Sequence, residues 1–143
     1  MRLILCSALL IAAACSSEPE PAMSAGLFAG VDRDALCIAG EPGEQRGGFI
    51  TYGKGDMNCS AKGSIVADGG QFALVPQGEG EGECRFPLTQ NPDGVTIGTP
   101  ESCSYYCGPG LSAEGRTFRR MGSGASSKSA PDAVTDLAGD PLC

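Results

Sequence analysis

Residues 64–75 read SIVADGGQFALV, two short apolar runs separated by Asp68, Gly69 and Gly70. Glycine accepts the positive φ that primed hairpin turns require, so this pattern predicts two antiparallel strands, 64–67 and 71–75, joined by a tight turn. Apolar runs alternate with Gly, Asp, Asn and Pro clusters on both sides of this hairpin, which is typical of strands and turns. The chain is therefore predicted to be mainly β.

Six further strands are expected around the hairpin, at 36–39, 48–52, 84–88, 95–99, 103–107 and 116–121. Asn91–Gly94 forms another turn, in which the proline presets φ and the glycine supplies freedom. Strands at this spacing predict either a small antiparallel β-sandwich or a barrel-like meander, and the pattern does not choose between them. A short helix near the C-terminus is expected from Pro131 to Leu137, with Asp132 as its N-cap or as an acid in its first turn, and with Gly139 ending it.

The two-residue period of a strand indicates which side chains form the core. Side chains that share a face, and are predicted to be buried, are Phe72 with Leu74, Cys84 with Phe86 and Leu88, and Val95 with Ile97.

Cysteines are expected to staple this domain. The chain lacks Trp and is rich in Gly and Pro, so its core is thin, and small exported domains compensate with disulfides. Six cysteines are predicted to be bridged, which allows fifteen pairings: Cys37, Cys59, Cys84, Cys103, Cys107 and Cys143. The favoured pairs are Cys59 with Cys84, which flank the hairpin, and Cys37 with the terminal Cys143.

The N-terminus is typical of an export signal. Arg2 precedes an uncharged apolar run, and small residues lead up to Cys15. The run is shorter than the roughly 20 residues needed to span a bilayer. Residues 1–17 resemble the lipobox signal of bacterial lipoproteins, although Ala12 stands where that family most often has Leu. The resemblance implies cleavage before Cys15 and acylation of its sulfur, and it leaves an even set of six cysteines for disulfides.

Three parts of the chain follow from these patterns. Residues 1–14 are predicted to be the signal peptide, 15–26 a lipidated tether rich in Ser, Pro and Glu, and 27–143 a single β-rich domain. The resemblance implies a protein held in the bilayer through acylated Cys15, in the bacterial cell envelope. Ser16 is similar to the residues that permit sorting to an outer membrane, where the domain would face the periplasm or the surface.

Composition excludes several classes of function. Cleavage removes Arg2, which leaves nine Lys and Arg against seventeen Asp and Glu, a net charge of about −8 at neutral pH. Such an acidic protein is a poor partner for nucleic acid, whose recognition depends on basic side chains. The chain contains no His, the commonest general acid–base and a common zinc ligand. We therefore expect neither an enzyme nor a protein with a metal or organic cofactor.

The segment from Cys103 to Cys107 is the most distinctive candidate site. Its two cysteines could form a redox dithiol or a metal site, but their spacing is not that of a CxxC motif, and exported cysteines are usually structural. Tyr105 and Tyr106 alternate faces in an extended chain, which would leave one for the core and one as a ligand-binding contact. The acidic run Gly78–Glu83 is expected to be a solvated loop.

These patterns favour a membrane-tethered module that binds a protein, for example by inhibiting a basic envelope or secreted hydrolase. An acidic surface would steer a basic partner toward it. Two alternatives stay open. One is a structural accessory of envelope assembly, and the other is a thiol redox or metal-binding protein that uses Cys103 and Cys107.

Overall fold

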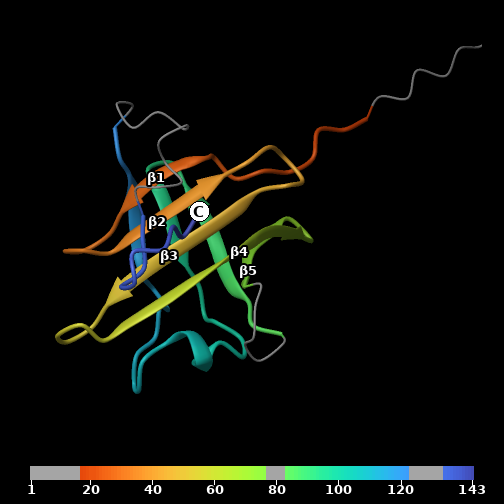
Figure 1. The fold of residues 1–143 in the computed structure, drawn as a ribbon. Helices are drawn as coiled ribbons and strands as arrows, with labels where there is room; N and C mark the ends of the chain where they lie inside the picture. Colours follow the sequence, from red (N-terminus) through yellow and green to blue (C-terminus); the bar gives the residue numbers. More distant parts are fainter. Residues whose placement is uncertain (1–16, 77–82, 123–133) are drawn as a thin grey trace, which may run out of the picture.

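The computed structural model describes residues 17–76, 83–122 and 134–143, which form an eight-stranded antiparallel closed barrel (Figure 1). The strands are β1 (Gly26–Ala29), β2 (Ala35–Ala39), β3 (Arg46–Tyr52), β4 (Asn58–Asp68), β5 (Gln71–Pro76), β6 (Phe86–Asn91), β7 (Gly94–Ile97) and β8 (Thr117–Arg120). Each strand pairs with the next, and β8 closes the barrel against β1, with Phe28 opposite Arg120. The barrel is therefore the correct choice of the two predicted architectures, and closure pairs edges that a sandwich would leave open.

Seven of the eight predicted strands overlap observed ones, and the hairpin through Gly69 and Gly70 joins β4 to β5. The prediction for residues 103–107 was wrong, because this segment contains a short 3-10 helix, η1 (Ser104–Tyr106). The sequence pattern also fails to predict β1. Its two large apolar residues are adjacent: Phe28 enters the barrel, while Leu27 joins a second cluster outside it, so the strand shows no alternation.

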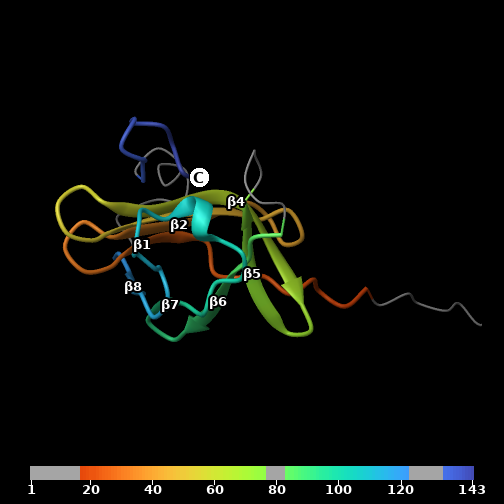
Figure 2. The same ribbon diagram turned by 90° about the horizontal axis from the view of Figure 1, so that it is seen from below.

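The up-and-down order of the strands gives the barrel two different ends (Figures 1 and 2). We call one the tether end, because the chain enters β1 there. It also carries the turns 40–45, 69–70 and 92–93. The opposite end, here called the loop end, carries the turns 30–34 and 53–57 and the long connection 98–116 between β7 and β8. In Figure 1 the described stretch before β1, residues 17–25, lies on the right, whereas the turns 30–34 and 53–57 lie on the left.

Side chains fill the inside of the barrel. Four phenylalanines are at most 2% exposed, namely Phe28, Phe49, Phe86 and Phe118. The rings of Phe49 and Phe86 meet edge to face with centroids 4.8 Å apart, a favourable aromatic geometry. The predicted core residues Leu74, Cys84, Phe86, Leu88, Val95 and Ile97 are buried, and Phe72 is partly buried against them.

Met23 closes the core at the tether end. It lies in the stretch assigned to the tether, yet its side chain is 3% exposed and packs with the interior cluster. The buried side chain of Gln45 holds the Met23 backbone at both polar groups: Oε1 accepts the Met23 N–H at 2.8 Å, and Nε2 donates to the Met23 carbonyl at 2.8 Å. The chain is thus fixed to the barrel three residues before β1 begins.

The C-terminal segment 134–143 packs on the outside of the barrel. Val134 and Leu142 cover the outward-facing Leu27 and Ile50, and Cys143 bonds to Cys37 on β2 as the sequence predicts. The predicted helix is not formed in the described part, residues 134–137. Asp136 instead begins a turn, in which its Oδ1 accepts N–H groups from Ala138 and Asp140, and this polar competition favours the turn over a helix.

Candidate binding surface

Two disulfides hold the connection 98–116 across the loop end. They join Cys59 to Cys107 and Cys84 to Cys103. The predicted Cys59–Cys84 pair was therefore wrong. Cys59 is the second residue of β4 and Cys84 lies two residues before β6, and β5 lies between those strands. Two strand spacings are about 9.5 Å, whereas bridged Cα atoms are usually less than about 7 Å apart. The connection 98–116 passes close to both cysteines and supplies a nearer partner for each, Cys107 for Cys59 and Cys103 for Cys84.

The helix η1 lies between the two stapled cysteines. It is closed by hydrogen bonds from the Tyr106 N–H to the Cys103 carbonyl at 3.0 Å and from the Cys107 N–H to the Ser104 carbonyl at 3.2 Å. Tyr106 is partly buried and packs on the core, with its ring centroid 6.2 Å from that of Phe86. Tyr105 is 64% exposed, and its ring rests edge-on against Tyr106 at 5.1 Å. One tyrosine thus anchors the turn while the other faces solvent.

The residues after η1 lie against the neighbouring turn 53–57. The Gly108 N–H donates to the Asn58 carbonyl at 2.9 Å, and the Leu111 N–H donates back to the Gly108 carbonyl at 3.0 Å. Gly110 has a φ of +72°, a conformation that favours glycine and lets the chain reverse. Because of these contacts, the whole tyrosine loop, defined here as residues 103–111, is fixed to the barrel at several points.

Large hydrophobic side chains are exposed mainly at the loop end. Five stand out in the described part of the chain, and three of them, Val31, Met57 and Tyr105, lie on the loop-end connections. Arg33 is also there, with its guanidinium 3.9 Å from the centre of the Tyr52 ring and 3.3 Å from Asp56. Exposed aromatic, methionine and arginine side chains are the residue types enriched in protein interfaces.

A buried ion pair supports this end from beneath. Asp34, whose side chain is 3% exposed, accepts a hydrogen bond from Arg116 Nη1 at 2.9 Å. Its other oxygen accepts the Tyr52 N–H at 2.8 Å, and Arg116 Nη2 donates to the Tyr52 carbonyl at 3.1 Å. The network ties the turn 30–34, the end of β3 and the end of the long connection together. Sequence reasoning missed both charged residues, since an acid before one predicted strand and an arginine at the start of another have no distinctive pattern.

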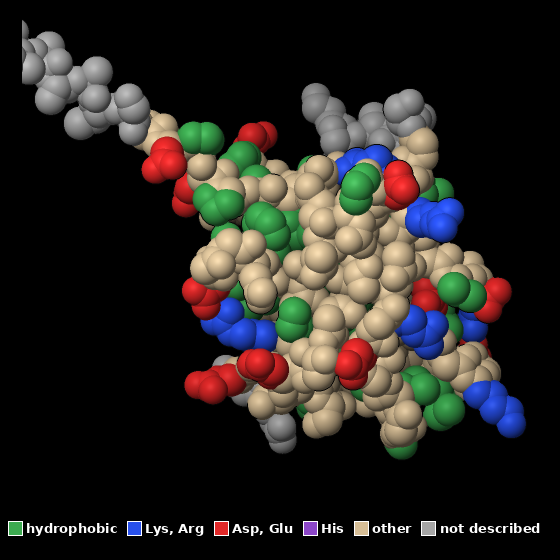
Figure 3. All heavy atoms as spheres, turned by 180° about the vertical axis from the view of Figure 1, so that it is seen from behind, with side chains coloured by type: hydrophobic (Ala, Val, Ile, Leu, Met, Phe, Trp, Pro, Cys, Tyr) green, Lys and Arg blue, Asp and Glu red, His purple; other side chains and the backbone are tan. Residues whose placement is uncertain are grey.

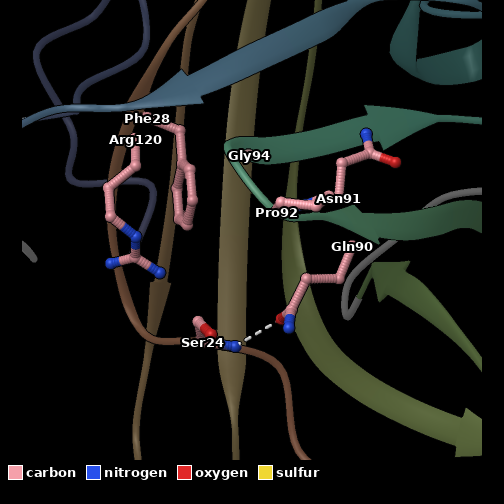
Figure 4. A pocket seen from close by; sticks show the side chains of 7 residues that line it. All are labelled: Ser24, Phe28, Gln90, Asn91, Pro92, Gly94 and Arg120. Atoms are coloured by element: carbon pink, nitrogen blue, oxygen red, sulfur yellow. Dashed lines mark hydrogen bonds between the residues drawn. The ribbon is translucent and has the colours of Figure 1, made fainter.

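A pocket of about 360 Å³ lies at the tether end (Figure 4). Its polar groups hold the entering chain. Gln90 accepts the Ser24 N–H at 2.6 Å, and Arg120 donates to the Ala25 carbonyl at 2.9 Å while its guanidinium lies over the Phe28 ring. We therefore interpret this pocket as part of the attachment of residues 24–25 to the barrel.

The thiol alternatives depend on free sulfurs at Cys103 and Cys107. In the structure both sulfurs are in disulfides, so neither provides a thiolate for redox chemistry or for a metal in this oxidised form. No cluster of three or more potential metal ligands occurs within residues 17–76, 83–122 and 134–143. Most of the acidic run Gly78–Glu83, and also Cys15, lie outside the described residues.

Charge is dispersed rather than concentrated on the face opposite that of Figure 1. Acidic and basic side chains alternate there among polar groups (Figure 3). The excess of acid over base is therefore a property of the whole chain and not of one patch on this face.

Comparison with known proteins gives no relative for this chain: no family model, no curated protein and no solved structure matches it. Within the described ranges, no helix has the length and apolar character needed to cross a bilayer.

Proposed function

We propose that this protein is a lipid-anchored protein of the bacterial cell envelope that binds a basic protein through the loop end of its barrel. The observation that carries the proposal is Tyr105. It is 64% exposed on a turn held by two disulfides, beside a partly buried tyrosine that packs on the core. An exposed aromatic ring at a fixed position is typical of a binding contact.

Rigidity of the tyrosine loop supports a role in recognition. Ordering a loop on binding costs free energy that reduces affinity, and covalent staples remove that cost beforehand. Here one connection receives two of the three disulfides found in the described chain, one on each side of η1. A loop needed only to join β7 to β8 could be far shorter, because antiparallel neighbours are joined by connections of two to five residues.

The position of the tether also supports the proposal. The described chain reaches the barrel at the tether end, and Met23 fixes it there. An anchor at Cys15 would therefore place the loop end on the side of the barrel away from the bilayer, where a protein partner has access. The stretch before Met23 is exposed and rich in proline, which suits a spacer.

Net charge selects the class of partner. At about −8 the exported chain would attract basic proteins, and such steering raises association rates. A basic hydrolase that attacks the envelope, such as a lysozyme, is the partner class that suits this charge and location, and binding at its active-site cleft would inhibit it. The proposal for this partner rests on charge and compartment.

The test is binding of the purified mature domain to a panel of basic secreted hydrolases, beginning with a lysozyme, measured by biolayer interferometry. We expect Tyr105→Ala to raise Kd at least about tenfold, the effect of a moderate hot spot. The matched control is Leu137→Ala, which removes a similarly exposed large side chain (57% against 64% for Tyr105) from the C-terminal segment instead. Equal affinities for the two variants would contradict the assignment of the loop end, and absence of binding across the panel would overturn the partner class.

A further inference from the structure

A pocket of about 320 Å³ lies at the loop end beside the tyrosine loop. We call it the hydroxyl pocket, because its polar lining includes the hydroxyls of Thr99, Ser102, Ser104 and Ser112. Leu111 supplies an apolar wall, and Cys103 and Cys107 bring their disulfides to its side. Its volume is at the lower limit for ligand pockets, which fits a single side chain better than a large cofactor.

Among the described residues that line the hydroxyl pocket, Glu114 alone is charged, and no Lys or Arg faces it there. Thr99 Oγ1 donates a hydrogen bond of 2.6 Å to Glu114 Oε1, and the Glu114 N–H donates to Ser112 Oγ at 3.1 Å. An ionised carboxylate has about four acceptor positions, so one bond from Thr99 leaves it able to accept more. Glu114 is solvent-exposed at the mouth of the pocket, so its carboxylate gives this pocket a negative charge that water partly screens and that an N–H donor can still approach.

The walls of the pocket are held in advance of any ligand. The two disulfides fix Cys103 and Cys107, and Arg85 and Glu101 exchange backbone hydrogen bonds of 3.0 Å in each direction at its edge. Ser102 has a φ of +54°, in the left-handed region that is unfavourable for most residues other than glycine. Such conformations persist only where the surroundings impose them, and they are concentrated at functional sites.

From these observations we infer that the hydroxyl pocket receives a lysine or arginine side chain of the protein partner, with Glu114 as its counter-ion. The inference rests on the proposed function, and it names the contact that selects a basic partner. The serine hydroxyls accept the remaining N–H donors of the cation, and Leu111 packs on its methylene stem, which long basic side chains bury readily. A divalent cation suits the pocket poorly, since calcium requires six to eight oxygen ligands and a single carboxylate is present.

The first test uses small probes and needs no protein partner. The ¹⁵N-labelled mature domain is titrated with N-acetyl-arginine methylamide and N-acetyl-lysine methylamide, with N-acetyl-glutamine methylamide as the neutral comparison. We expect saturable chemical-shift changes at residues 102–104 and 111–114 with the basic probes. Glu114→Gln should abolish them, while its amide oxygen still accepts the hydrogen bond from Thr99. Glu44→Gln, which removes an equal charge from an exposed turn at the tether end, should leave them unchanged.

Shifts that are absent, or that are the same in Glu114→Gln and in the wild type, would overturn the inference. The second test repeats the hydrolase binding assay. There we expect Glu114→Gln to raise Kd about tenfold, as for a charge pair that becomes partly desolvated in an interface, and Glu44→Gln to change it less than about threefold. If a basic hydrolase binds but the two variants behave alike, this inference fails and the proposed function stands. If the probes bind at Glu114 and no hydrolase does, the pocket chemistry is upheld and the proposed partner is wrong.

Discussion

At the scale of single residues, one buried carboxylate holds the loop end together. Asp34 accepts hydrogen bonds from Arg116 and from the Tyr52 backbone, and thereby joins three parts of the chain that are distant in sequence. Desolvating a carboxylate is costly unless it is paired and hydrogen-bonded. Asp34 meets both conditions, since each of its oxygens has a partner: Oδ1 accepts from the Tyr52 N–H and Oδ2 from Arg116.

Replacing Asp34 with Ala should lower the free energy of unfolding by about 2–3 kcal/mol. The change removes two hydrogen bonds to a charged group and leaves Arg116 without its counter-ion. Arg116 is one-third exposed, so water partly compensates its charge. Urea denaturation of the mature domain measures the effect. Asp56→Ala is the control, because its ion pair with Arg33 is 80% exposed at Asp56 and should contribute less than about 1 kcal/mol. Equal losses in both variants would contradict this account.

Single residues show where sequence reasoning succeeds. Alternation correctly assigns Phe86, Leu88, Val95 and Ile97 to the interior, because the two-residue period follows directly from strand geometry. It cannot identify Asp34 and Arg116 as partners, since they are 82 residues apart and meet only when the barrel closes. Nor can it give the exposure of Tyr105, which depends on whether its segment is a strand or a 3-10 turn.

At the scale of elements, the C-terminal segment behaves as a strap on the outside of the barrel. A Cβ added to Gly48 on β3 would lie 2.0 Å from the Leu142 carbonyl oxygen, so the strap approaches the sheet closely and requires glycine beneath it. Leu142 is 3% exposed between Leu27 and Ile50, and Cys143 then bonds to Cys37. The strap thus covers apolar side chains that would otherwise face water.

Two leucines of the strap test this description. Leu142→Ala should cost about 2–3 kcal/mol of unfolding free energy, through lost burial and the cavity left behind. Leu137→Ala should cost less than about 0.5 kcal/mol, because its side chain is 57% exposed. Thermal and urea unfolding of the two variants, with the Cys37–Cys143 bond intact, give the comparison. If Leu142→Ala is as stable as Leu137→Ala, the strap is held by its disulfide alone.

Elements also mark the limit of prediction from sequence. Short turns such as the one at Gly69 and Gly70 carry their geometry in their residues, so the β4–β5 hairpin was correctly predicted. The two disulfides of the tyrosine loop were not correctly predicted, because the path of a long connection is determined by its tertiary contacts and not by its local sequence. The Cys37–Cys143 pair was correct, and the Cys59–Cys84 pair failed because adjacency along the chain is a poor guide to adjacency around a barrel.

At the scale of the whole molecule, we propose a different role for each end of the barrel, attachment of the N-terminal chain at one and binding of a partner at the other. The tether end holds the incoming chain through Met23, Gln45 and the pocket beside Arg120, whereas the loop end presents the tyrosine loop and the hydroxyl pocket. A closed meander suits this division, because every turn belongs to one end or the other and the strands between them are fully paired. The anchor proposed at Cys15 would then orient the loop end away from the bilayer.

The anchor itself is tested at Cys15. If the proposed lipoprotein assignment is correct, the mature protein isolated from its own membrane should begin at Cys15 and carry added acyl mass, with no thiol open to alkylation when reductant is omitted. Several acyl chains hold a protein stably in a bilayer. Without the Cys15 sulfur the diacylglyceryl group has no attachment atom. Cys15→Ser should therefore block processing or release the domain from the membrane fraction, as intact mass and fractionation would show.

The domain should still fold in this variant, because its six bridged cysteines are retained. Unchanged anchoring of Cys15→Ser would refute the lipoprotein assignment, and alkylated Cys103 and Cys107 in the wild type would restore a thiol function at the loop end.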